Sequence, residues 1–529
     1  MACVANRKVL LISPSAKEMQ ASAISQAGYE NIGLGYLSSY LRKNKWNVEV
    51  LNLDVIHNIK VVFYQEDKVS LNDDIALILE KICSNPPALI GISVTMMSIN
   101  DSLLISRAIK NRYPNMKICL GGNHASICCE EILNNESTID FVVIGDGEIF
   151  FHQLLEEVVN DGKYEHIPNL AYRTTSKKVI INKSKLINQK ELNSFPFPAR
   201  DDLKLLQQYF KITEARISTS RGCNGHCTFC CDTVLNPQRI WIPKDPKLVV
   251  DEIEHLYNNY GIGYFWINDD NFITSTSDGR KRAQLIAEEI INRKLEINYR
   301  ALFRPDAFIE SDPLLSLLKR SGLHTAYIGF ESSSQSKLKR FGKNIAPSNY
   351  YRIVRELKEN NIGVQVGFIM FDPFTTFDDL YEDAIFLHKI GQLYLFTNFT
   401  QMLDVFPQTP ISKIMKNKGL INKESTYKSN NNDYHFVDTR VEVLANFLND
   451  IYKRKLSQID RNMQRIRLFG SSDFSHTHLD AVVDAINNNN YQFLIEIISD
   501  CKNSNFDEIK FETLVDAVIE KNNQLLSSY

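Results

Sequence analysis

The stretch that decides the fold is ARISTSRGCNGHCTFCC, residues 215–231, in which a short strand candidate leads into clustered cysteines. Cys223, Cys227 and Cys230 are separated by three and then two residues. Thiolates are the usual ligands of iron–sulfur clusters, and a tight loop can direct three sulfurs at one cluster. Three ligands leave one iron open to an amine and a carboxylate. The stretch therefore predicts a 4Fe-4S site, with Cys231 as a spare thiol or a substitute for a lost ligand.

A structural zinc site is the main alternative for this loop. Such sites usually take four ligands arranged in two pairs. His226 could supply a fourth ligand, but no second pair follows nearby. A chance grouping of cysteines is a weaker alternative still, and a long intracellular chain seldom uses its cysteines in disulfides.

The bulk properties indicate an ordinary protein of several domains. The 529 residues exceed the ~250–300 residues at which a single core stops growing. Hydrophobic residues make up 44% and charged residues 23%, which is typical of globular chains. The formal net charge of -3 gives no basic excess of the kind that nucleic-acid-binding proteins usually carry. We therefore expect no DNA partner, while a small or transient RNA substrate stays open.

Neither a targeting segment nor a membrane span is expected. The N-terminus, MACVANRK, runs directly into VLLIS with no signal-peptide pattern before it. The apolar run ALIGISVTMM is far shorter than the ~20 residues that a membrane helix needs. These features predict a soluble, cytoplasmic protein.

Strand and helix patterns alternate along residues 1–165, which predicts a doubly wound parallel sheet with helices on both faces. The loops at the carboxyl ends of such strands form a binding crevice. Residues 166–210 are expected to contain a hairpin and a linker. The predicted strands of the sheet are 8–13, 46–53, 88–95, 117–122 and 140–145.

Residues 211–424 repeat a strand–helix unit six times, which predicts a partial (β/α)6 barrel with its reactive groups at the carboxyl ends of the strands. Residues 425–529 are predicted as a third, helical domain. This domain could close over the barrel mouth or serve only in packing or dimerisation. The six predicted barrel strands are 215–220, 264–269, 297–303, 325–330, 363–370 and 393–400.

With these features together, the chain resembles the radical S-adenosylmethionine (SAM) superfamily over its central part. The cysteine spacing is the superfamily signature, and Phe229 fills the aromatic place before the third cysteine. The resemblance implies that the open iron binds the methionine part of SAM. An electron from the cluster would cleave SAM to a 5′-deoxyadenosyl radical, which removes a hydrogen atom from the substrate.

The same resemblance implies SAM contacts for Phe229 and for the segments DDNF (269–272), FRPD (303–306) and GFESS (329–333). Glu331 is expected at the amino group and Arg304 at the carboxylate, which Arg can hold with two parallel bonds. A surface ion pair is the alternative for Arg304. The remaining expected SAM contacts are Asp270 and Ser332.

One segment departs from the superfamily pattern. A glycine-rich turn, roughly G-x-P-x-E-T, is expected after the fifth barrel strand, whereas this chain has FDPFTTFDD at 371–379. Contacts to the SAM adenine are therefore not carried over to this region.

The N-terminal part resembles the cobalamin-binding domain that is fused to many radical SAM enzymes. Glycines at strand ends let a backbone approach a ligand closely, although they could also serve only in tight turns. His124 is a weak candidate, since a lone loop histidine is more often solvated. The resemblance implies cobalamin contacts at Ser13, Gly35, Ser93, Thr95, Gly121, Gly122, His124 and Gly145.

The Asp-x-His-x-x-Gly motif that supplies a histidine to cobalt is missing. DVIHN (54–58) comes close, but its spacing and its lack of glycine do not fit. Fused radical SAM enzymes often lack this motif, so its absence leaves cobalamin as an expected cofactor and leaves the lower cobalt ligand unassigned.

The resemblance implies a radical methyltransferase. Methylcobalamin would supply the methyl group and the 5′-deoxyadenosyl radical would activate an unactivated carbon of a small-molecule or peptide intermediate. A non-methylating cyclisation or rearrangement with the same cofactors is the first alternative. A plain radical SAM reaction with a degenerate cobalamin domain is the second, and a non-catalytic iron–sulfur module is the last. An electron donor such as flavodoxin or ferredoxin is the expected partner.

Overall fold

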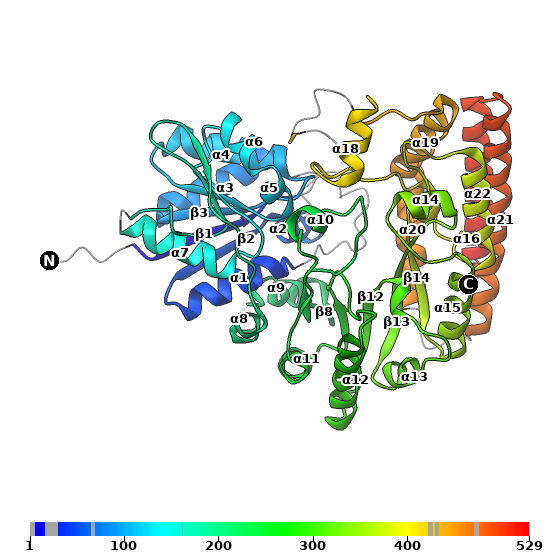
Figure 1. The fold of residues 1–529 in the computed structure, drawn as a ribbon, viewed down its shortest axis with the longest axis horizontal. Helices are drawn as coiled ribbons and strands as arrows, with labels where there is room; N and C mark the ends of the chain where they lie inside the picture. The colour runs from blue at the N-terminus through cyan, green and yellow to red at the C-terminus, as the bar shows by residue number, and fades with distance from the viewer. Residues whose placement is uncertain are drawn as a thin grey trace.

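The computed structural model describes residues 6–15, 30–64, 69–160, 162–421, 427–428, 433–469 and 476–527. Figure 1 shows an N-terminal α/β domain beside a second α/β body, with long C-terminal helices on the side of that body away from the first domain. None of the described helices is both long enough and apolar enough to span a bilayer.

The first sheet has, within the described residues, seven strands in the order β2-β1-β3-β4-β5-β6-β7. β1 to β5 run parallel, and their order reverses between β1 and β3. Ligands of open α/β sheets bind at such a reversal, beyond the carboxyl ends of the strands. The strands are β1 Lys8–Ser13, β2 Asn47–Asn52, β3 Leu89–Ser93, β4 Ile118–Gly121, β5 Phe141–Val143, β6 Leu170–Arg173 and β7 Val179–Ile181.

Helices cover both faces of this sheet, as the alternating pattern predicts. One face packs against α1 (Ile32–Lys43) and α7 (Glu148–Val159). The other face packs against α3 (Leu71–Ser84), α4 (Ile99–Arg112), α5 (Asn123–Ile127) and α6 (Cys129–Asn135). The parallel strands are buried on both faces and therefore read as nearly continuous apolar runs.

The predicted hairpin is present but belongs to the first sheet. β6 pairs antiparallel with β5, and β7 pairs antiparallel with β6. The chain then reaches the barrel through α8 (Gln189–Ser194) and α9 (Asp201–Phe210). α9 packs against α2 (Leu53–Phe63) through a small apolar cluster, while its Leu203 belongs to the barrel core, so this connection is structured and contacts both bodies.

The second sheet is a parallel sheet of five strands among the described residues, in the order β14-β13-β12-β11-β8. Its helices lie between the strands in sequence and share one large apolar core with it. The strands are β8 Glu214–Ile217, β11 Tyr264–Ile267, β12 Asn298–Phe303, β13 Leu323–Glu331 and β14 Gly363–Phe368, and the helices are α11 Pro246–Tyr260, α12 Ser277–Asn292, α13 Pro313–Arg320, α15 Ser348–Glu359 and α16 Phe377–Lys389.

The sixth predicted barrel strand, 393–400, is wrong. Residues Thr397–Thr400 form the short helix α17, and this side of the barrel has an isolated parallel bridge between Phe371 and Met402. The reason is tertiary, because C-terminal side chains bind the backbone that a strand would use. Asp460 accepts hydrogen bonds from the amides of Phe396 (2.8 Å) and Thr397 (2.7 Å).

The C-terminal helices pack on the outside of the barrel. α21 (His476–Lys502) lies against α16, with the ring of Tyr491 stacked on His388 at 4.1 Å. α22 (Glu508–Ser527) lies beside α21, away from the first domain (Figure 1). These two helices therefore have the packing role rather than covering the barrel mouth. The other elements here are α18 Pro410–Asn417, α19 Thr439–Ile451, the π-helical turn Tyr452–Leu456 and α20 Ser457–Phe469.

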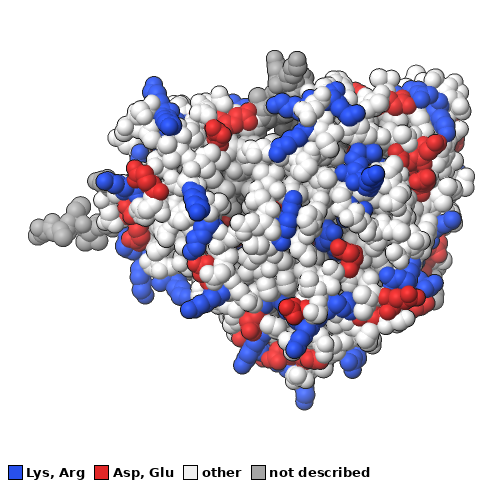
Figure 2. All heavy atoms as spheres, viewed as in Figure 1, with Lys and Arg blue, Asp and Glu red and all other residues white. Residues whose placement is uncertain are grey.

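Charged side chains of both signs are spread over the face shown in Figure 2. Basic side chains gather toward its upper centre, in the region of α18, which carries exposed Lys413 and Lys416. The mixture agrees with the small net charge of -3.

Candidate functional site

A cavity of about 410 Å³ lies between the two sheets. The carboxyl ends of the first sheet's strands line one wall, and the loops after β8 and β11 line the other. Residues predicted separately from distant parts of the sequence therefore meet at one site. From the first domain these are Ser93, Gly121, Gly122 and Gly145, and from the barrel they are Cys230 and Asp270, with Cys231 beside them.

The glycines of the first wall serve two different needs. Gly122 has φ +96°, and a Cβ there would lie 2.7 Å from the carbonyl oxygen of Val94, so the turn itself requires glycine. A Cβ on Gly121 would meet no heavy atom within 4 Å, and this residue does not need a left-handed conformation. The same open space surrounds Gly145, at φ +73°. This wall therefore leaves room for a bulky ligand to approach the backbone, which fits cobalamin.

The other predicted cobalamin residues are not among the described residues that line the cavity. The Ser13 hydroxyl accepts a hydrogen bond from Asn31 (3.0 Å). Thr95 donates to the hydroxyl of Ser98. Gly35 allows close packing, since a Cβ there would lie 2.9 Å from the carbonyl oxygen of Ala199.

His124 is buried and contacts Tyr427, which lies 303 residues further along the chain. Its Nε2 lies 2.7 Å from the carbonyl oxygen of Tyr427, and burial lowers its pKa. The Tyr427 hydroxyl donates to Glu136 (2.6 Å). Nearby, the amide of Gln408 donates to the carbonyl oxygen of Ile127 (2.6 Å). These contacts tie the end of the barrel to the first domain, a role that the sequence did not indicate.

His57, from the near match to the cobalt motif, is also used elsewhere. It lies in α2, is buried, and its Nε2 is hydrogen-bonded to the carboxylate of Asp74 of α3. His57 does not line the described cavity, which agrees with the sequence-based conclusion that DVIHN is not a cobalt-binding motif.

The cysteine loop begins at Gly222, whose φ of +70° and close approach to the carbonyl oxygen of Ile240 (2.6 Å from a Cβ) exclude a side chain. The amide of Gly225 donates to the sulfur of Cys223 (3.3 Å). Among the described residues, no three thiol, imidazole or carboxylate groups converge as a preformed metal site. The fit to a 4Fe-4S cluster therefore comes from donor chemistry, since three thiols share one short loop beside a cationic side chain.

That cation is Arg304. Its Nη1 lies 3.2 Å from the sulfur of Cys227, and a Cβ on Gly225 would lie 2.3 Å from the same nitrogen. Nε and Nη2 bind Asp306, each at 3.1 Å. The ion pair that was the alternative for Arg304 is therefore present, and it holds the guanidinium against the cysteine loop. Burial raises the pKa of Cys223 to about 12, while Arg304 acts in the opposite direction.

Phe229 and Cys231 flank Cys230 in the loop. The ring of Phe229 packs edge-on against Phe341 at 5.3 Å, so it anchors the loop on the barrel core. A hydrogen bond between Cys230 and Cys231 raises the pKa of the former and lowers that of the latter. Cys231 lines the cavity as a thiol next to the predicted cluster ligands.

The two aspartates of DDNF have different tasks. Asp269 is buried and accepts hydrogen bonds from the amide and hydroxyl of Thr219 and from the hydroxyl of Ser220. It thereby fixes the start of the cysteine loop, and sequence reasoning missed this role although the paired carboxylates were visible. Asp270 faces the cavity. Burial, with added repulsion from Asp232, raises its pKa to about 6.

Glu331 and Ser332 lie at the end of β13. Glu331 has φ +67°, and its carboxylate pairs with Lys343 at 3.0 Å. Lys343 also donates to the carbonyl oxygen of Gly329 (2.5 Å). Ser332 is fully buried, and its hydroxyl donates to Asp383. The Ser332 hydroxyl is therefore committed to the protein interior.

Arg221 joins the cysteine loop to the first domain. Its guanidinium binds Glu148 (2.9 Å) and lies 3.5 Å from Asp146, both in the segment that follows β5. It also lies over the ring of Tyr36 at 5.0 Å. The two walls of the cavity are thus held together by an ionic contact that no sequence motif indicated.

Comparison with known proteins agrees with this arrangement. Residues 25–155 match the B12 binding domain family, and residues 217–387 match the radical SAM superfamily. The chain is 26% identical over 384 residues to an uncharacterized methyltransferase of Pyrococcus horikoshii, covering 72% of this chain and 78% of that protein. It is 25% identical over 318 residues to an anaerobic magnesium-protoporphyrin IX monomethyl ester cyclase of Synechocystis, covering 60% and 61%.

The fold is similar to that of the cobalamin-dependent SAM radical enzyme OxsB, whose structure holds aqua-cobalamin and SAM. The TM-score is 0.73 at 18% sequence identity, covering 98% of this chain and 81% of that one. At this identity the likeness concerns the fold. It extends through the C-terminal helices as well as the two matched domains.

Proposed function

Because the chain is a radical SAM enzyme with a B12 binding domain, we propose that it is a cobalamin-dependent methyltransferase acting on an unactivated carbon. The substrate would be a small-molecule or peptide natural-product intermediate. The observation that carries the proposal is the shared cavity, in which Gly121 and Gly145 of the first domain face Cys230 and Asp270 of the barrel. Methyl transfer needs the two cofactors in one enclosed space, and radicals need exclusion of water.

The protein's own groups have distinct parts in this proposal. When bound, the cluster supplies the electron that cleaves SAM, and cobalamin carries the methyl group. Cys223, Cys227 and Cys230 would hold the cluster. Arg304 is the proposed partner of the SAM carboxylate, and its position 3.2 Å from the sulfur of Cys227 supports this role. Glu331 is the proposed partner of the SAM amino group, which would share this carboxylate with Lys343.

The test uses the anaerobically reconstituted protein with cobalamin, a reductant, SAM carrying a deuterated methyl group, and candidate substrates. The expected result is a product that gains the labelled methyl group, together with S-adenosylhomocysteine and 5′-deoxyadenosine. Formation of 5′-deoxyadenosine with a rearranged product and no S-adenosylhomocysteine would contradict methyl transfer and support the cyclisation alternative. A flavodoxin or ferredoxin is the proposed natural electron donor.

A further inference from the structure

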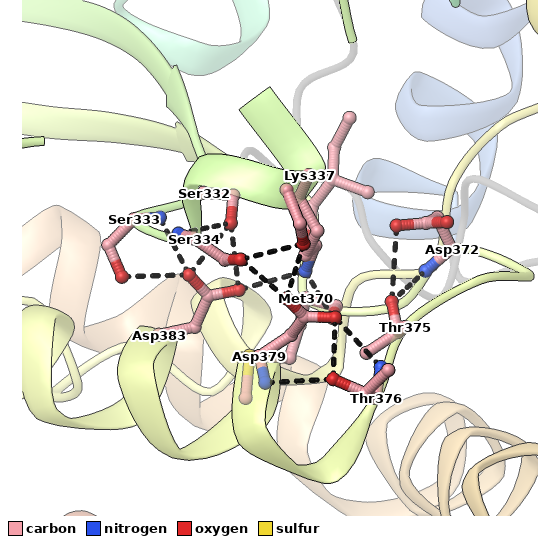
Figure 3. Close-up of polar contacts among 12 residues, drawn as sticks. Ser332, Ser333, Ser334, Lys337, Met370, Asp372, Thr375, Thr376, Asp379 and Asp383 are labelled. Atoms are coloured by element: carbon pink, nitrogen blue, oxygen red, sulfur yellow. Dashed lines mark hydrogen bonds and ion pairs between the residues drawn. The ribbon is translucent and has the colours of Figure 1, made fainter. Parts of the chain in front are cut away.

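A buried polar cluster joins the ends of β13 and β14 to α16 (Figure 3), and it begins at Ser332, directly after the proposed SAM residue Glu331. At its centre, Lys337 of α14 (Gln335–Arg340) pairs with Asp383 of α16 at 2.8 Å. Both side chains are 0% exposed. A charge at such depth is costly unless its hydrogen bonds are fully made, so the partners of this pair show what it holds in place.

Lys337 holds the end of β14. Its ammonium group donates to the carbonyl oxygens of Ile369 and Met370, both at 2.9 Å, and to Asp383. An ammonium group has three donors, and all three are used. Two of them bind backbone that has just left the sheet.

Asp383 holds the turn after β13. It accepts hydrogen bonds from the hydroxyl of Ser332 (2.8 Å) and from both the amide (2.6 Å) and the hydroxyl (2.9 Å) of Ser333. Asp379, one turn earlier on α16, accepts from the hydroxyls of Ser334 and Ser336. The serine-rich turn is therefore attached to α16 along its whole length.

The residue between these two anchored segments is Glu331. The pairing of β13 with β14 shifts register between Gly329 and Glu331, and Glu331 has φ +67°. The Glu331 carbonyl oxygen accepts from the amide of Ile369 (2.8 Å). A non-glycine residue in this backbone region is strained and persists only when its surroundings fix it.

The following turn is fixed by side chains where the superfamily pattern predicts glycine. Phe371 is fully buried. Asp372 accepts from the hydroxyl of Thr375 (3.2 Å) and pairs with Arg340 at 2.8 Å. The end of β14 thus relies on polar contacts from α14, the same helix that carries Lys337.

We infer that Lys337 and Asp383 are positioning residues for SAM binding, which fix the ends of β13 and β14 so that the Glu331 carboxylate is presented to SAM. This inference rests on the proposed function of Glu331. Stability alone is a weak reason for a buried ion pair, since apolar or neutral replacements of both partners are often tolerated, whereas loss of one partner is strongly destabilising.

That asymmetry supplies the experiment. Lys337→Met and Asp383→Asn each leave one buried charge unpaired and are expected to lower the melting temperature. The double variant Lys337→Met/Asp383→Asn has no unpaired charge and is expected to recover most of that loss. Since a methionine side chain at this position cannot donate to the carbonyl groups of Ile369 and Met370, SAM affinity is expected to stay about tenfold or more below wild type, roughly 1.4 kcal/mol.

SAM binding is measured by calorimetry on the reconstituted protein, and by the change that SAM causes in the electron paramagnetic resonance spectrum of the reduced cluster. Substrate-free 5′-deoxyadenosine formation is expected to show a raised KM for SAM with kcat largely kept. The matched control is Asp140→Asn, which breaks the Lys110–Asp140 pair (2.8 Å). Asp140 directly precedes β5, at the amino end of that strand. The control variant is expected to lower stability without changing SAM affinity.

Wild-type SAM affinity in the double variant would overturn the inference, as would affinity that follows melting temperature across all variants. Failure of the proposed function would give a different experimental result. In that case the reconstituted wild-type protein itself would show no SAM-dependent spectral change and no 5′-deoxyadenosine.

Discussion

The two sides of the proposed cofactor site are built by opposite means. The first domain presents a glycine edge, made of Gly121, Gly122 and Gly145, which lines the cavity and has open space beside Gly121 and Gly145. The barrel carries an ionic edge, made of Arg304, Glu331 and Lys343 with the pair Lys337–Asp383 behind it. Arg304 contacts the cysteine loop, and none of these five is among the described residues that line the cavity. A large ligand needs room and many backbone contacts, whereas a small zwitterion needs a few charges held in fixed positions. The contrast agrees with the proposal that cobalamin binds at the glycine edge and SAM at the ionic edge.

The largest expected effect is on iron content and SAM cleavage, and it concerns the cysteine loop beside the ionic edge. Cys227→Ala is expected to remove most of the iron and all SAM cleavage, because a cluster needs all three thiolates of the loop. Iron content and 5′-deoxyadenosine formation check this. Cys231→Ser is the matched control and should keep both, since Cys231 is outside the predicted ligand set. Full iron content in Cys227→Ala would refute the ligand assignment.

An intermediate effect is expected at the glycine edge. Gly121→Val fills the open space that a Cβ would enter, so cobalamin retention should fall by about tenfold or more, a loss of roughly 1.4 kcal/mol. SAM binding should not change, which would show that the glycine edge and the ionic edge bind different cofactors. Gly263→Val, at another glycine with open space around it, is the control. Equal cobalamin loss in both variants would show that glycine replacement acts through general stability.

The smallest expected effect is on melting temperature and concerns Asp270, which lines the cavity on the barrel side. Its pKa is raised to about 6 in the folded protein, so the folded protein holds this proton more tightly than the unfolded chain does. This contribution to stability is present below the ordinary pKa of the group and is lost as pH rises through about 6. Between pH 4 and 7, wild type should therefore lose more melting temperature than Asp270→Asn, by a few degrees. Parallel pH profiles for the two proteins would contradict the raised pKa.

The sequence predicted what depends on local pattern. The spacing of Cys223, Cys227 and Cys230 and the glycines after apolar strands are local signals, and the order of strands and helices confirms the fold class. The predicted strand at 393–400 failed because an apolar run of that length does not distinguish a strand from a buried helix. Asp460, more than sixty residues later, decides the outcome by binding the amides of Phe396 and Thr397.

The polar contacts between distant segments could not be predicted. Arg221 with Glu148, and Lys337 with Asp383, are ordinary charged residues in sequence. Their meaning comes only from burial and from the backbone groups that they bind. Asp269 is the exception, because the adjacent aspartates of DDNF were visible in the sequence. The predicted role was assigned to Asp270 alone.

The contacts of Tyr427 and Gln408 with the first domain bear on how fast the enzyme can exchange a cofactor. The linker with α9 connects the two bodies on one side, and these contacts connect them near α18 on the other (Figure 1). A hinge about the linker alone would have to break the bonds of Tyr427 to His124 and Glu136 first. We therefore expect a bulky ligand held between the two domains to leave more slowly while the contacts of Tyr427 and Gln408 are intact.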